Sequence, residues 1–214
     1  MDQQQLDNLQ ASYDTVAEEY ARRIYDELQY KPLDRQLLDR LAAGVPQGGT
    51  ICDMGCGPGQ IARYLHEHGA QVIGVDLSSQ MIARARQLNP GLEFRQGNML
   101  ALEVEDGAWA GIAAFYSIIH IPRDEVVTAL HELKRVLQPG GLLLVAFHLG
   151  TEVVHLDEWW EQPVSADFVH FLAPEMQAYL QSAGFLIEDL IERPPYPEVE
   201  YPSHRAYILA SKPA

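Results

Sequence analysis

Cysteine, basic residues and long apolar runs are all scarce in this sequence. Its 214 residues include 2 cysteines and only 15 Lys and Arg against 30 Asp and Glu, so the formal net charge is −15. Cys52 and Cys56 cannot build a disulfide framework, and no second Cys or His pair lies nearby at zinc-ligand spacing. The acidic balance repels phosphate backbones, which argues against nucleic acid or an anionic membrane as a partner.

No apolar run approaches the roughly 20 residues that span a bilayer. The first ten residues are polar and lack the basic and apolar regions of a secretory signal. Hydrophobic residues make up 47% of the chain and charged residues 21%, an ordinary globular composition. We therefore expect one cytoplasmic domain over residues 1–214 that holds no metal, with a monomer and a homodimer both left open.

From residue 50 onward, short apolar runs alternate with amphipathic stretches, a pattern typical of βαβ units and a parallel sheet. The predicted strands cover 50–53, 71–76, 92–96, 111–116 and 142–147, and the predicted helices cover 60–68, 78–87 and 125–136. Two amphipathic helices precede this core. Residues 151–171 show no clean period and read as an inserted loop or lid. A helix over 174–183 and two strand-like runs, 185–191 and 206–211, predict a closing hairpin on the sheet edge.

The first predicted strand ends in Asp53 and runs into three glycines at alternate positions, Gly55, Gly57 and Gly59. Glycines permit a tight turn and let backbone N–H groups face a polar ligand at the start of the next helix. Asp76 ends the second strand, where an acid can accept hydrogen bonds from ribose hydroxyls. These features together indicate a ligand of the nucleotide type. A dinucleotide site would require the longer glycine spacing G-x-G-x-x-G.

The segment Asp53-x-Gly55-x-Gly57-x-Gly59, with Asp76 behind it, resembles the first two motifs of class I S-adenosylmethionine-dependent methyltransferases. Segments 97–99, 116–121 and 133–141 resemble the later motifs, in the same order. The nearest group is the small-molecule methyltransferases similar to those of ubiquinone and menaquinone biosynthesis. The resemblance implies a doubly wound, mostly parallel, seven-stranded Rossmann-like α/β sheet with an antiparallel C-terminal strand. It also implies S-adenosylmethionine as the cofactor and a small-molecule acceptor.

Within that family pattern, residues 1–43 would form a helical lid, 50–148 the cofactor-binding core, 149–172 a substrate cap, and 173–214 a C-terminal helix and hairpin. Asp53 and the glycines would shape the methionine end of the cofactor site, and Asp76 would hold the ribose. Asn98 stands where the family more often has Asp, and it would still accept from the adenine amine. The full set of expected cofactor residues is Tyr13, Tyr20, Asp53, Gly55, Gly57, Gly59, Asp76, Leu77, Met81, Asn98, Met99 and Tyr116.

Methyl transfer is an in-line displacement, so a general base matters only where the acceptor must lose a proton. His148 and His120 follow strands five and four at the ligand-bearing edge, and with Tyr13 they are the catalytic candidates. Each histidine could instead be a structural side chain satisfied by the backbone. The expected substrate residues are Trp159, Trp160, Phe168 and His155, whose aromatic rings suit an apolar or planar ligand but could also simply pack a lid on the core.

Three other functions stay open at this point. A metal site could in principle use His148, His155, Asp157, Glu158 and His170, although their spacing matches no familiar site. An NAD-dependent dehydrogenase would need a hydride-transfer set that is not evident. A non-catalytic binding module, or an enzyme that methylates a protein partner, would use the same fold.

Overall fold

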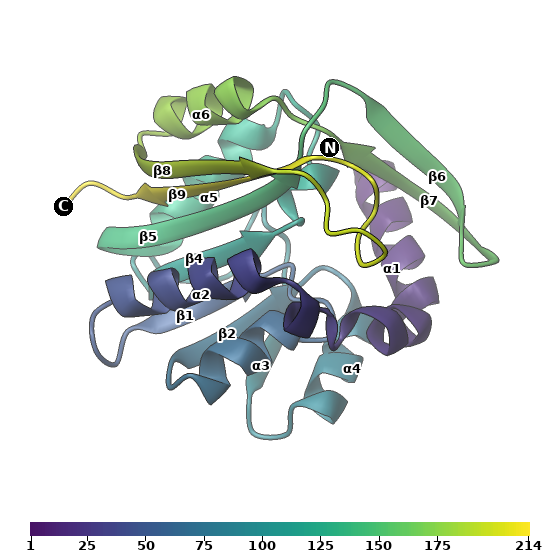
Figure 1. Ribbon diagram of the computed structural model, residues 1–214, viewed down its shortest axis with the longest axis horizontal. Coiled ribbons are helices and arrows are strands. Elements are labelled where there is room, and N and C mark those ends of the chain that lie inside the picture. The colour runs from purple at the N-terminus through teal and green to yellow at the C-terminus, as the bar shows by residue number, and fades with distance from the viewer.

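A computed structural model describes all residues, 1–214, and contains a seven-stranded sheet in the order β3-β2-β1-β4-β5-β9-β8 (Figure 1). The strands are β1 Thr50–Met54, β2 Gln71–Asp76, β3 Glu93–Gln96, β4 Trp109–Phe115, β5 Leu137–His148, β8 Leu186–Arg193 and β9 Arg205–Ser211. The first five pair in parallel, and β9 runs antiparallel to both neighbours. The predicted α/β fold is confirmed.

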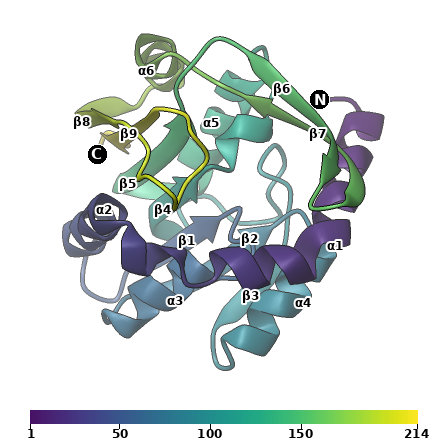
Figure 2. The same ribbon diagram turned by 45° about the vertical axis from the view of Figure 1, so that its right-hand side comes forward.

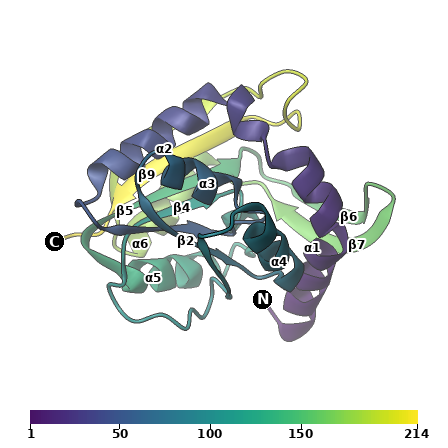
Figure 3. The same ribbon diagram turned by 90° about the horizontal axis from the view of Figure 1, so that it is seen from below.

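Helices cover both faces of the sheet (Figure 3). They are α1 Gln3–Ile24, α2 Pro32–Gly44, α3 Gln60–Glu67, α4 Ser79–Leu88, α5 Val126–Val136 and α6 Ala173–Ser182. Because side chains alternate along a strand, Cys52 and Met54 of β1 face the layer of α5 and α6, whereas Ile51 faces α2 and α3. Strands buried on both faces explain why the sequence shows continuous apolar runs there.

Helix α1 lies at the edge of the sheet where the parallel strands end (Figure 1). Asp2 caps its start in a capping box with Gln5. A short 3₁₀ turn over Glu27–Tyr30 separates it from α2, which begins at Pro32. Proline is compatible with a first helical position because its missing N–H is not needed there. Asp14 fastens α1 to α4, since its Oδ1 accepts from the hydroxyl of Ser78.

The predicted loop or lid over 151–171 is instead a β-hairpin, which corrects the sequence-based expectation of irregular structure. Strands β6 Val153–Trp159 and β7 Gln162–Val169 pair antiparallel as a separate two-stranded sheet that crosses α1 (Figure 2). Trp160 and Glu161 form its turn with φ values of +53° and +64°. The backbone N–H of Ser165 on β7 donates to the hydroxyl of Ser12 on α1 at 2.8 Å. The hairpin and α1 therefore pack as one cover.

The C-terminal pair forms the expected antiparallel hairpin at the edge of the sheet. Strand β9 inserts between β5 and β8, so only β8 lies on the edge. Strand β5 begins at Leu137, earlier than predicted, because the Gln138–Gly141 turn already pairs with neighbouring backbone. No helix is both long and apolar enough to cross a membrane.

Candidate active site

The glycine loop follows β1 at the carboxyl end of the sheet. The N–H groups of Gly55 and Cys56 both donate to the carbonyl of Val75 on β2, at 2.7 and 3.0 Å. Gly55 has a φ of +76°, and a Cβ there would lie 2.3 Å from the Cβ of Ser117. Only glycine allows this close approach between the loops after β1 and β4. Gly59 caps α3 in the left-handed region and faces Phe94 rather than a cavity.

Asp76 and Asp53 hold this loop from two sides. Asp76 accepts from the N–H of Gly57 through Oδ2 and from that of Ser78 through Oδ1, each at 2.8 Å. Asp53 is 1% exposed and accepts from the N–H of Ala62 in α3 at 3.0 Å. Burial raises the pKa of Asp53 to about 7 and that of Asp76 to about 6, against the opposing effect of these hydrogen bonds. Of the two acids, only Asp76 lines a cavity.

That cavity encloses about 770 Å³ of space, the open solvent at its mouth included. It brings together most of the expected cofactor residues. They are Tyr13, Tyr20, Gly55, Gly57, Asp76, Leu77, Asn98, Met99 and Tyr116. Met81 is fully buried instead against Val16 and Ala17 of α1, so it supports the cavity wall without lining it.

Ser117 and Gln10 are among the lining residues that the expected set does not contain. Ser117 follows β4, and its buried hydroxyl has no hydrogen-bond partner within the chain. A buried hydroxyl that faces a cavity without a partner indicates a ligand group there. Gln10 reaches the cavity from α1. Asn98 already accepts from the N–H of Leu100 through Oδ1 at 2.9 Å, which leaves its second lone pair and its amide donors for a ligand.

Tyr13 and His120 form a buried pair above the cavity. The Nδ1 of His120 lies 2.8 Å from the carbonyl oxygen of Asp167 and must donate to it, so Nε2 is the acceptor for the Tyr13 hydroxyl at 2.7 Å. Burial lowers the pKa of His120 to about 4, and burial raises the pKa of Tyr13. Both side chains are therefore neutral at pH 7, and both ring nitrogens of His120 are already engaged.

A second cavity of about 1,260 Å³, including its mouth, lies beneath the hairpin. Trp159, Trp160 and Phe168, three of the expected substrate residues, line its apolar side. The ring centroids of Trp159 lie 5.5 Å from Tyr13 and 5.7 Å from Tyr20. Tyr13, Tyr20 and Tyr116 line both cavities, so they form a common wall between the two.

Tyr116 is a strained member of this wall. It has a φ of +53°, which costs a non-glycine residue of order 1–3 kcal/mol. Its N–H donates to Ala146 on β5 at 2.9 Å, and its hydroxyl shares a hydrogen bond with that of Tyr207 on β9 at 3.1 Å. These contacts fix the ring between the cavities.

His148 lines the second cavity but not the first. Its Nδ1 lies 2.7 Å from the hydroxyl of Ser203, and its ring stacks on Tyr116 with centroids 5.0 Å apart. Burial, followed by the charge of Arg205, lowers the pKa of His148 to about 3. The side chain is neutral at pH 7, and Nε2 is not engaged by any hydrogen bond within the chain.

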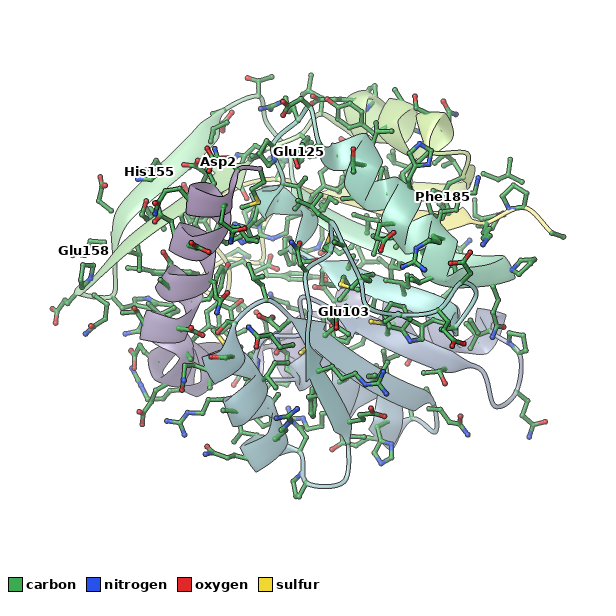
Figure 4. All side chains as sticks on the ribbon, turned by 180° about the vertical axis from the view of Figure 1, so that it is seen from behind. Asp2, Glu103, Glu125, His155, Glu158 and Phe185 are labelled. Carbon is green, nitrogen blue, oxygen red and sulfur yellow. The ribbon has the colours of Figure 1, made fainter.

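His155 is the one expected substrate residue that lies apart from this cavity. It occupies the outer face of the hairpin near Glu158 (Figure 4), with Nδ1 2.6 Å from Asp167. It lines a third hollow beside Asn8 and Arg123. No group of three or more His, Cys, Asp or Glu side chains is placed to hold a metal ion.

Known proteins resemble this chain in sequence and in fold. Residues 51–141 match the family model of a methyltransferase domain. A malonyl-(acyl-carrier protein) O-methyltransferase of Enterobacter lignolyticus is 30% identical over 151 residues, which cover 68% of this chain and 58% of that protein. A 2-phytyl-1,4-naphtoquinone methyltransferase of Thermosynechococcus vestitus is 29% identical over 210 residues, covering 84% and 91%. A SAM-dependent methyltransferase of Methanosarcina mazei superposes with a TM-score of 0.71 at 20% identity, covering 80% and 95%.

Residues 51–141 are a methyltransferase domain, and the chain is similar over most of its length to methyltransferases. The predicted resemblance to S-adenosylmethionine-dependent methyltransferases is thereby confirmed, and S-adenosylmethionine is the cofactor. The contacts expected of Asp53, the glycines and Asp76 stay predictions. The residues present fit it, because the first cavity combines a glycine-walled floor, the carboxylate of Asp76 and the unpartnered hydroxyl of Ser117. The chain spans less than two thirds of the Enterobacter relative, so its own acceptor is a separate question.

Proposed function

We propose that this methyltransferase transfers a methyl group to a small organic molecule held beneath the β6–β7 hairpin. One observation carries the proposal: the cofactor cavity and the aromatic cavity meet at Tyr13, Tyr20 and Tyr116. A displacement at carbon requires the methyl group and the acceptor atom to be in direct contact, so in this proposal the two ligands meet beside the three tyrosines. When bound, S-adenosylmethionine supplies a methyl group activated by its sulfonium.

Within this proposal, Asp76 and Asn98 hold the nucleoside and the loop around Gly57 shapes the amino-acid end. The hairpin aromatics orient the acceptor and exclude water. Positioning of this kind can lower the reaction barrier by roughly 7–11 kcal/mol. The chain therefore needs to contribute little further chemistry.

The two histidines have different roles in this scheme. His120 acts as a positioning residue, because both its nitrogens are occupied by Tyr13 and Asp167. His148 faces the acceptor cavity and can receive a proton at Nε2 where an acceptor must lose one. With a pKa of about 3 it is a weak base, so it suits an acceptor that is acidic or already ionised.

The acceptors named for relatives, a malonyl-carrier protein and a phytylated naphthoquinone, show that family membership does not fix the acceptor. A screen with isotope-labelled S-adenosylmethionine over carboxylates, phenols, thiols and amines tests the proposal by mass spectrometry. A labelled product that forms with wild type and is lost in Asp76→Ala is expected. Formation of S-adenosylhomocysteine without a methylated product from any of the four compound classes would contradict the proposal. The cytoplasmic location and the monomeric or homodimeric state stay predictions.

A further inference from the structure

The aromatic cavity has a charged end opposite its hairpin wall. Lys31, at the start of α2, and Arg205, at the start of β9, line it together with Glu27 and Glu200. Lys31 is 5% exposed and Arg205 3%. The Lys31 ammonium lies 5.7 Å from the ring centroid of Tyr116, and the Arg205 guanidinium carbon lies 5.8 Å from it. The cationic end therefore adjoins the wall shared with the cofactor cavity.

The two acids at this end are already paired with cationic side chains of the protein. Glu200 accepts from both terminal nitrogens of Arg193, at 2.6 and 2.9 Å, and from the N–H of Tyr196 at 2.8 Å. Burial alone would raise the pKa of Glu200, but the Arg193 hydrogen bonds and nearby cations lower it to about 2. Glu27 pairs with Lys31 at 2.5 Å.

The N–H donors of Arg205, by contrast, do not all form hydrogen bonds within the chain. A guanidinium has five N–H donors, and Arg205 makes one hydrogen bond, from Nη1 to the carbonyl of Ser203 at 2.6 Å. Its buried Nε lies 3.3 Å from Glu200 without a hydrogen bond in this geometry. A buried cationic group with unused donors, open to a cavity, matches a ligand rich in acceptor oxygens.

We propose that the acceptor of this enzyme is an amphipathic carboxylate, whose head group is bound by Arg205 and Lys31 and whose apolar body lies against Trp159, Trp160 and Phe168. This inference rests on the proposed function. A single negative charge is favoured over a phosphate dianion, because Glu27 pairs with Lys31 and offsets one of the two lining cations. The weak basicity of His148 agrees with an acceptor that is ionised before it binds.

Octanoate, octanol and octylamine test the proposal, because they share one apolar body and differ in the head group. Each is titrated into protein saturated with S-adenosylhomocysteine, with tryptophan fluorescence as the readout. Trp159 and Trp160 line the cavity, whereas Trp109 is buried in the sheet. Octanoate should bind at least tenfold more tightly than either neutral or cationic analogue.

Variants separate the head-group site from the apolar wall. Arg205→Met should weaken octanoate at least tenfold and octanol less than twofold, and Lys31→Met should act in the same direction. Phe168→Ala is the matched control, because it should weaken octanoate and octanol equally. Calorimetry with S-adenosylhomocysteine checks each variant for an intact cofactor site.

The outcomes distinguish this inference from the proposed function. If wild type does not bind S-adenosylhomocysteine, the proposed function fails. If it binds that compound but shows no preference for octanoate, the carboxylate inference alone is overturned. Unchanged octanoate affinity in both Arg205→Met and Lys31→Met would overturn it as well.

Discussion

Gly57 offers the sharpest separation of cofactor binding from folding. It lies in the left-handed region with a φ of +50°, and a Cβ there would meet only Tyr20, at an ordinary 3.6 Å. Gly55 and Gly59 are poorer choices, because their Cβ atoms would clash with Ser117 at 2.3 Å and Phe94 at 2.8 Å. Gly140 is a matched control, since its φ is +73° and nothing lies within 4 Å.

The stability cost of Gly57→Ala should equal that of Gly140→Ala. Placing alanine in the left-handed region costs roughly 1–2 kcal/mol, against a total stability of about 5–15 kcal/mol. For a chain of this length, that lowers Tm by about 2–8 °C, and both variants stay folded. The binding effects should differ, because the Gly57 methyl group enters the space between the loop and Tyr20, where the cofactor belongs.

Calorimetry with S-adenosylhomocysteine and thermal melts of both variants provide the test. We expect Gly57→Ala to lose at least tenfold in affinity, or about 1.4 kcal/mol, and Gly140→Ala to keep the wild-type affinity. Equal affinities for the two variants, at equal Tm losses, would place the cofactor away from this loop.

Three further predictions concern the acid, the cap and the base. Ionised Asp76 accepts hydrogen bonds from the ribose better than protonated Asp76, and its pKa is raised to about 6. The affinity for S-adenosylhomocysteine should therefore fall roughly tenfold per pH unit below pH 6 and level off above it. An affinity that does not change with pH would argue against this role of Asp76. Trp160→Ala should raise the KM of an identified acceptor and spare cofactor affinity, so a loss of cofactor binding would assign the hairpin to the other cavity. His148→Ala should lower kcat for an acceptor that starts protonated and leave a carboxylate unaffected; equal losses for both would refute its function as a base.

The parts of the fold and site that depend on local pattern could be predicted. The glycine loop and Asp76 are consecutive elements of one βαβ unit, so their positions at one edge follow from the parallel sheet. The roles proposed there from the family resemblance stay predictions for calorimetry to test.

The hairpin could not be predicted because its usual signals are absent. Its tight turn contains Trp160 and Glu161 at positive φ, where Asn-Gly or Asp-Gly would be typical. Strand β6 alternates exposed and half-buried residues only from Val153 to Asp157, because a register shift between Leu156 and Glu158 interrupts the alternation.

The charged end of the acceptor cavity depends on long-range placement. Lys31, Glu200 and Arg205 come from the start of α2, the β8–β9 connection and the start of β9, and no local motif links them. Because β9 is antiparallel, its first residue lies at the carboxyl edge of the parallel strands, which places Arg205 beside the site. Only the strand order reveals this.

Calorimetric titration of the wild-type protein with S-adenosylmethionine, alongside Asp76→Ala and an NAD titration, tests the central claim most directly. The account predicts one site per chain for S-adenosylmethionine, strong weakening in a folded Asp76→Ala variant, and no heat with NAD. Absence of binding to wild type, or an affinity unchanged by Asp76→Ala, would contradict it.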